Sequence, residues 1–165
     1  MVLPLTRSAK PTRAEVTQAL TKAAVGHFVK LRYGVYTELG LARGGTFRAD
    51  VIALNYRKHI VICEIKSCYA DWAADTKWLV SLDFCDRYYL VFSQAVWETH
   101  ELQIRPSIKG RGAGVLVLDS TTGFLRSVVP ASTLEFTEDR DDLILRMAFR
   151  GDFTKRNTTR RKVFL

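Results

Sequence analysis

Three charged residues close together in the chain have the types and spacing of a metal-dependent hydrolytic site. Asp50 comes first, and Glu64 and Lys66 follow as Glu64-Ile65-Lys66 after thirteen intervening residues. All three lie within apolar runs typical of buried strands. An ionised group in such a place costs several kcal/mol unless it is paired or binds a metal.

Two predicted strands must position these residues. Residues 47–54 and 59–66 are rich in apolar β-forming residues, and the polar residues 55–58 between them have the composition of a tight turn. The pattern predicts a β-hairpin that carries one acid on each arm.

The register of that hairpin decides whether the two acids meet. If Asn55 pairs with His59, the numbers of opposed residues sum to 114, and Asp50 lies across from Glu64. Directly opposed residues have Cβ atoms about 4.5–5.5 Å apart. Lys66 shares the face of Glu64, because side chains two apart in a strand point the same way. A slip of one residue would turn Asp50 to the other face.

Two carboxylates this close suit a divalent cation. They repel each other unless a cation lies between them, and an oxygen-rich site favours Mg²⁺ or Mn²⁺. We expect Asp50, Glu64 and the backbone carbonyl of Ile65 to be the metal ligands. The metal can acidify a water, and the Lys66 ammonium can hold that water and stabilise charge on a phosphate. A structural salt bridge that involves Lys66 or Arg48 is the alternative.

Further charged residues could extend this site. Glu38 ends a predicted strand over 35–39 and is a candidate additional metal ligand, with an exposed strand-end acid as the alternative. Basic residues that could contact DNA phosphates would give salt-sensitive, sequence-independent affinity, whereas a solubilising tail is the alternative. These candidates are Arg48, Lys77, Lys109, Arg111, Lys155, Arg156, Arg160, Arg161 and Lys162.

The remaining elements are predicted from periodicity and turn signals. A capping box at Thr12 and Glu15 begins a helix over 13–32. Further helices are expected over 70–82 and 94–103, strands over 88–92, 115–118 and 124–129, and a mobile loop over 106–114. Residues 143–149 follow two acids and are predicted to form a last helix, with a strand as the alternative.

This order of elements is typical of an α/β sandwich with a mixed central sheet. One domain is expected over 12–153, between a flexible basic arm at 1–11 and a basic tail at 154–165. No GxGxxG or Walker A sequence occurs, so nucleotide binding has no support.

Charge and cysteine content narrow the function classes. The net charge is +8 over 165 residues, distributed as +7 in 1–62, −3 in 63–150 and +4 in 151–165, which favours a polyanionic partner. The three cysteines form no CxxC pair, which argues against a disulfide framework or a zinc site and favours the cytoplasm. No apolar run reaches the roughly 18 residues of a membrane span.

Several runs resemble a known family. RADVIAL, IVICEIKS, DWAADTKW and DFCDRYYLVF are similar to the PD-(D/E)XK nuclease superfamily, and within it to the MmcB-type DNA repair endonuclease-like proteins. The resemblance implies a restriction-endonuclease-like fold, with a mixed four-stranded sheet between helices. It also implies Asp50 as the family's Asp, Glu64 as its D/E and Lys66 as its Lys.

We therefore expect a Mg²⁺- or Mn²⁺-dependent DNA endonuclease in DNA repair, recombination or phage DNA processing, with Asp50, Glu64 and Lys66 as catalytic residues. One alternative is a catalytically inactive DNA-binding accessory protein of the same fold. The other is a Holliday-junction-resolvase-like nuclease that acts as a homodimer. The expected partner is DNA in each case, with no membrane.

Overall fold

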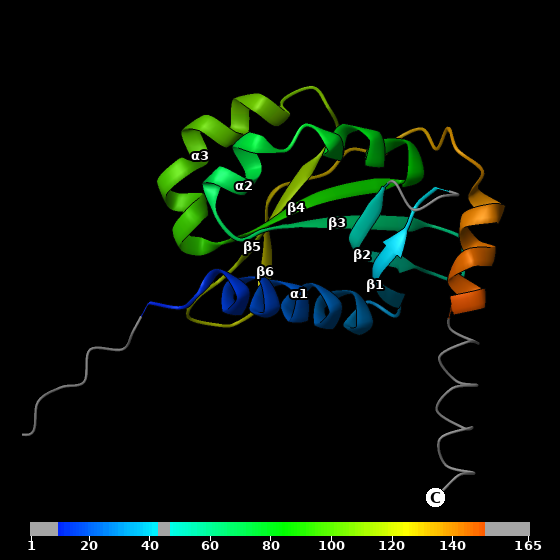
Figure 1. The fold of residues 1–165 in the computed structure, drawn as a ribbon, viewed down its shortest axis with the longest axis horizontal. Coiled ribbons are helices and arrows are strands. Elements are labelled where there is room, and N and C mark those ends of the chain that lie inside the picture. Colours follow the sequence, from blue (N-terminus) through cyan, green and yellow to red (C-terminus); the bar gives the residue numbers. More distant parts are fainter. Residues whose placement is uncertain (1–9, 43–46, 151–165) are drawn as a thin grey trace, which may run out of the picture.

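A six-stranded mixed sheet forms the centre of the protein (Figure 1). The structure is a computed structural model that describes residues 10–42 and 47–150. Its labelled elements are α1 (Arg13–Lys30), β1 (Gly34–Gly40), β2 (Arg48–Leu54), β3 (Ile60–Lys66), α2 (Tyr69–Ala74), the 3₁₀ helix η1 (Lys77–Phe84), β4 (Arg87–Ser93), α3 (Gln94–Ile108), β5 (Gly114–Leu118) and β6 (Leu125–Val129). A last helix covers 140–150.

The strands lie in the sheet in chain order. β1, β2 and β3 form an antiparallel meander, β3, β4 and β5 run parallel, and β6 returns antiparallel to β5. The predicted α/β sandwich with a mixed sheet is therefore confirmed, and its layers are consistent with a restriction-endonuclease-like sandwich. The implied size was wrong, since the sheet has six strands rather than four.

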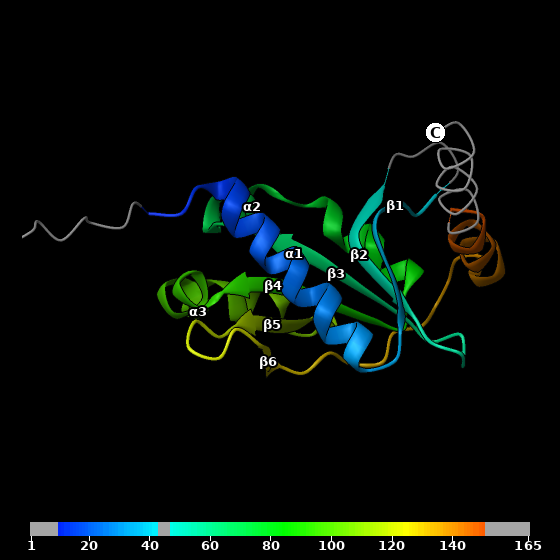
Figure 2. The ribbon, with the colours of Figure 1, turned by 90° about the horizontal axis from the view of Figure 1, so that it is seen from below.

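The two faces of the sheet have different covers. Among the described elements, α1 alone crosses one face, and α2, η1 and α3 lie over the other (Figures 1 and 2). Strand side chains alternate between the faces, so Val51 and Cys63 pack with α1, whereas Ile52 and Ile62 pack on the α2–α3 side. Asp50 shares the parity of Ile52, and therefore points to the α2–α3 face.

The capping box that begins α1 is confirmed. The Thr12 hydroxyl accepts a hydrogen bond from the Glu15 amide, and the Glu15 carboxylate accepts one from the Thr12 amide. The helix ends at Lys30, slightly before the predicted end, because Arg32 takes a left-handed backbone with φ of 64°.

The predicted continuous helix over 70–82 was wrong. α2 ends at Ala74, and Asp75 adopts an extended backbone before η1 begins at Lys77. The Asp75 carboxylate accepts a hydrogen bond from the Lys77 amide at 2.8 Å and another from Lys66 at 2.5 Å. A side chain that captures a nearby backbone amide competes with helical hydrogen bonding, which explains the break.

The predicted loop over 106–114 was also wrong in part. α3 continues through Pro106 to Ile108, beyond the predicted end at residue 103. Ile104 and Ile108 are both buried, and their burial offsets the backbone hydrogen bond that a proline cannot make.

The last segment is helical, as predicted for 143–149. The Arg140 guanidinium donates two hydrogen bonds to Asp86, and Leu143 and Met147 are buried in the core. The tail at 154–165 and most of the predicted arm lie outside the described residues. No helix in the described ranges is long and apolar enough to cross a membrane.

Candidate active site

The β2–β3 hairpin has the predicted register. Val51 pairs with Cys63 and Leu54 with Ile60, so opposed residue numbers sum to 114. The Ile65 amide donates a hydrogen bond of 2.8 Å to Asp50 Oδ2, which holds the Asp50 carboxylate beside β3.

Asn55 fixes that register at the turn. Its amide donates to the His59 carbonyl at 3.1 Å. Its side-chain oxygen accepts hydrogen bonds from the Arg57 and His59 amides at 2.9 and 3.1 Å. Lys58 completes the turn with a φ of 59°. Local turn chemistry thus sets the alignment that brings the two acids together.

Asp50 and Glu64 line the same cavity, of about 260 Å³. The rest of its wall consists of Phe47, Arg48, Asp75, Lys77, Trp78 and Ser81. The cavity therefore lies between the hairpin and the segment where α2 gives way to η1. Of the predicted DNA contacts, Arg48 and Lys77 lie at this site.

Lys66 lies behind the cavity wall. The residue is only 4% exposed, and its ammonium lies 3.3 Å from Glu64 Oε1 and 2.5 Å from Asp75 Oδ2. It reaches the cavity through these two carboxylates. The structure thus brings Asp50, Glu64 and Lys66 together on one face, as the strand geometry predicted.

Asp75 is the site residue that the sequence analysis missed. It lies in the run DWAADTKW, which the family resemblance already singled out. A continuous helix would have placed Asp75 on one face with Asp71. The structure separates them, because Asp71 binds Ser67 and Arg13, whereas Asp75 binds Lys66.

The site has more negative charge than its single buried ammonium balances. Burial and the charge of Asp50 raise the pKa of Glu64 to about 7, despite the nearby Lys66. Burial also raises the pKa of Asp50, although the Ile65 amide opposes the shift. For Lys66, burial disfavours the ammonium, but hydrogen bonding to Asp75 and the charge of Glu64 outweigh it and raise the pKa.

This electrostatic balance bears on metal binding. Asp50 and Glu64 are two partly buried carboxylates with raised pKa values. A cation bound between them would reduce their mutual repulsion, and their oxygens are ligands that such a cation prefers. Within the described residues, no group of three or more His, Cys, Asp or Glu side chains could hold a metal ion. A metal at this site would therefore use two carboxylates and complete its coordination with other oxygens.

The other predicted residues lie in three places. The Glu38 carboxylate is half-exposed and does not line the cavity itself, but it pairs at 2.6 Å with Nε of Arg48, which is part of the cavity wall. Lys109 and Arg111 lie on the turn after α3, and Arg111 lines a neighbouring hollow that Asp75 also lines. The tail candidates lie outside the described residues: Lys155, Arg156, Arg160, Arg161 and Lys162.

Comparison with known proteins places the chain in a family. The family described as DNA repair protein MmcB-like matches residues 6–151. The chain belongs to this MmcB-like family. No curated protein matches it.

A solved structure shares the fold of this MmcB-like chain, and two further ones are similar to it at a lower level. The SPO1766 protein of unknown function from Silicibacter pomeroyi is 23% identical with a TM-score of 0.69, and the match covers 93% of this chain and 94% of that one. An XisH family protein from Nostoc punctiforme is 12% identical with a TM-score of 0.48, over 66% and 96% of the two chains. A fdxN element excision controlling factor protein from Anabaena variabilis is 14% identical with a TM-score of 0.48, over 68% and 98%.

Proposed function

We propose that this chain is a metal-dependent DNA endonuclease of the PD-(D/E)XK type that acts in DNA repair. The observation that supports it is the meeting of Asp50 and Glu64 in one cavity, with the Lys66 ammonium directly behind them. Membership of a DNA repair protein family supports DNA as the substrate.

The two acids are the proposed holders of Mg²⁺ or Mn²⁺, together with the backbone carbonyl of Ile65. When bound, the cation would balance the carboxylates and acidify a water. The raised pKa of Glu64, about 7, supports this assignment, because the site is short of positive charge without the cation.

Lys66 is the proposed stabiliser of charge on the phosphate. In hydrolysis, a water oxygen forms a bond to phosphorus while one phosphorus–oxygen ester bond breaks. Negative charge then builds on the phosphate oxygens. Glu64 and Asp75 hold the ammonium and raise its pKa, so that it stays charged at neutral pH. A preorganised charge in a partly buried site stabilises such a transition state strongly.

Arg48 and Lys77 are the proposed DNA contacts nearest the reaction. Both side chains line the cavity. Contacts from these residues to the DNA backbone would position the strand without reading its sequence. Their loss should therefore weaken DNA binding on all sequences alike.

The test is cleavage of DNA with either metal. Covalently closed plasmid, linear duplex and four-way junctions are incubated with Mg²⁺, Mn²⁺ or a chelator. We expect the plasmid to be nicked or cut with metal alone, and Asp50→Asn and Lys66→Met to slow cleavage by about a hundredfold or more. A preference for junctions would favour the resolvase-like alternative.

The matched control is Asp83→Asn, which removes an exposed carboxylate from η1 outside the cavity. It should cleave like the unaltered protein, and melting curves should show that all variants fold. Cleavage that persists in Asp50→Asn would overturn the site assignment. DNA binding without cleavage under any metal would overturn the nuclease proposal in favour of an accessory protein.

A further inference from the structure

The face of the sheet that carries α1 is only partly covered. Six strands spaced about 4.8 Å apart span roughly 24 Å, whereas one helix is about 10 Å wide. α1 runs obliquely across the sheet and contacts β1 to β4 and β6, but it covers only part of the face, and hollows remain beside it (Figure 2). Tyr89 on β4 is only half-buried there, and Ser127 on β6 is exposed.

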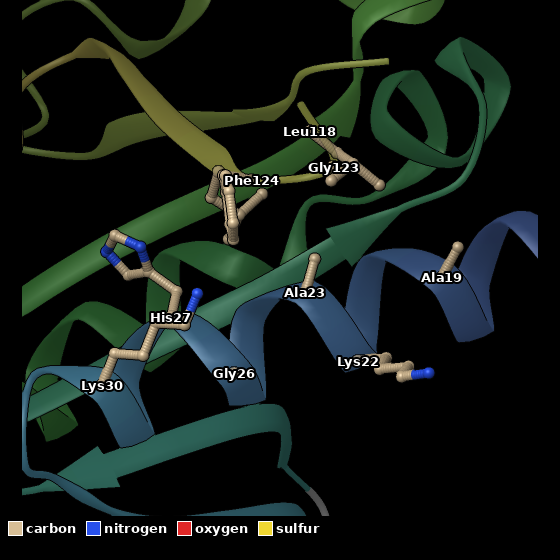
Figure 3. Close-up of a pocket in the computed structure, with 10 residues that line it drawn as sticks. Ala19, Lys22, Ala23, Gly26, His27, Lys30, Leu118, Gly123 and Phe124 are labelled. Atoms are coloured by element: carbon tan, nitrogen blue, oxygen red, sulfur yellow. The ribbon is translucent and has the colours of Figure 1, made fainter. Parts of the chain in front are cut away.

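Two hollows lie beside α1, and together we call them the α1 groove. The first has a volume of about 380 Å³ and lies between α1 and the β5–β6 turn (Figure 3). The second, of about 520 Å³, lies between the end of α1 and the first residues of β3 and β4. His27 lines both hollows, so they meet at that residue.

The charged residues that line the groove in the described structure are all basic. Its lining includes Lys22 and Lys30 from α1, Arg57 from the β2–β3 turn and Arg87 from β4. None of the described residues that line it is Asp or Glu. Lys22 and Lys30 are eight residues apart in a helix and thus about 12 Å apart along it. Such a row of cations is complementary to an extended polyanion.

Aromatic side chains also line the groove, next to these basic residues. Phe124 is 60% exposed, and the Lys30 ammonium lies 4.0 Å from its ring centre. In Figure 3, Phe124 points from the β5–β6 turn toward α1 and forms the opposite wall of the first hollow. Tyr33 and Tyr89 line the second hollow. Aromatic faces beside a basic track are what stacked bases require.

Gly26 provides a separate observation. It lies inside α1 between Lys22 and Lys30, on the floor of the first hollow (Figure 3). A Cβ at this position would meet nothing within 4 Å, so packing does not require glycine there. Glycine weakens a helix interior, and its other common use is to let a ligand approach the backbone closely.

We propose that the α1 groove binds a single strand of nucleic acid, on the sheet face opposite the candidate active site. The cations contact phosphates, and Phe124 and the two tyrosines stack against bases. A duplex keeps its bases paired and stacked, so it cannot offer them to these rings. This site needs neither the metal nor cleavage, and so stands independently of the proposed nuclease activity.

The test measures binding of a fluorescein-labelled, mixed-sequence single-stranded oligonucleotide by anisotropy, with chelator present so that no cleavage occurs. We expect tighter binding of the single strand than of the matched duplex. The double variant Lys22→Gln/Lys30→Gln should weaken single-strand binding by about tenfold or more. The salt dependence of log affinity should become shallower by about 1.4, because two phosphate contacts are lost.

The matched control is Arg105→Gln/Arg146→Gln, which makes the same change in net charge outside both the groove and the candidate active site. It should retain most of the single-strand affinity. Equal losses in the two double variants would mean that net charge alone governs binding, and would overturn the proposal. Equal or tighter binding of the duplex would overturn it as well.

Two uncharged changes sharpen the result. Phe124→Ala should weaken single-strand binding by about fivefold or more. Phe124→Trp keeps an aromatic ring at this position and should bind the single strand as tightly as the parent protein. Gly26→Leu should block the floor of the groove and weaken binding without lowering the melting temperature, since its Cβ would meet nothing within 4 Å and leucine favours a helix interior more than glycine does. Unchanged affinity in Gly26→Leu would refute the proposal that the single strand occupies the groove.

Discussion

The two faces of the sheet hold their charged residues in opposite ways. On the α2–α3 face, Glu64 and Asp75 contact the buried Lys66 ammonium, and Asp50 lines the same cavity. Burial raises the pKa values of Asp50 and Glu64. On the α1 face, lysines and arginines stand at the surface with no acid among the groove residues described. Buried charges therefore depend on one another for stability, whereas exposed ones act mainly through the field they create.

The sharpest test of this contrast removes one lysine from each face. Lys66→Met leaves Glu64 and Asp75 without their buried partner, and should destabilise the fold by about 3–5 kcal/mol. Lys22→Met removes an exposed charge and should change stability by less than about 0.5 kcal/mol. Urea unfolding in chelator measures both. Similar values for the two variants would show that Lys66 is not held as a buried charge.

The faces should also respond to pH with opposite signs. The pKa of Glu64 is about 7 in the folded chain against 4.5 ordinarily, so its proton is bound more tightly when folded. Its contribution to stability is complete below pH 4.5 and is lost as the pH rises toward 7, by about 3 kcal/mol. Burial and then the charge of Lys30 lower the pKa of His27, whose contribution is lost as the pH falls below 6.5.

Urea unfolding of Glu64→Gln and His27→Gln between pH 4.5 and 8 should separate these effects. The stability of Glu64→Gln relative to the parent protein should increase as the pH rises. That of His27→Gln should increase as the pH falls. If stability changes with pH in the same way in a variant and in its parent, the substituted residue does not contribute to the pH dependence.

Metal should stabilise the protein by binding at the α2–α3 face, not at the α1 face. At a concentration a hundred times the dissociation constant, Mg²⁺ or Mn²⁺ should add about 2.7 kcal/mol to the free energy of unfolding. Binding near pH 6.5 should release protons, because Glu64 is then largely protonated. Calorimetry in two buffers measures that release. Asp50→Asn should lose the response, and Lys22→Gln/Lys30→Gln should keep it.

The smallest predicted effect concerns two glycines. Gly26→Ala should stabilise the protein by about 0.5–1 kcal/mol, because the methyl group meets nothing and alanine favours the helix. Gly114→Ala is the contrast, since its Cβ would lie 2.6 Å from the Ala131 amide nitrogen and from the Tyr89 ring. Thermal melting should rise for the first variant and fall for the second.

Much of the site followed from the sequence because its geometry is local. The Asn55 turn set the hairpin register, and two-residue alternation placed Glu64 and Lys66 on one face. Asp75 did not follow, because its partner Lys66 belongs to another element. The helical pattern of 70–82 gives no sign that an ammonium from β3 will capture this carboxylate and stop the helix.

The sequence alone determined which acids can be neighbours, where the first helix begins and that the sheet is mixed, because these depend on residues a turn or a hairpin apart. Only the tertiary structure decided that α1 crosses one face of the sheet, that a groove remains beside it, and that Lys66 has two carboxylate partners. These features depend on how elements that are far apart in the sequence pack together against one sheet, and no short stretch of sequence specifies that packing.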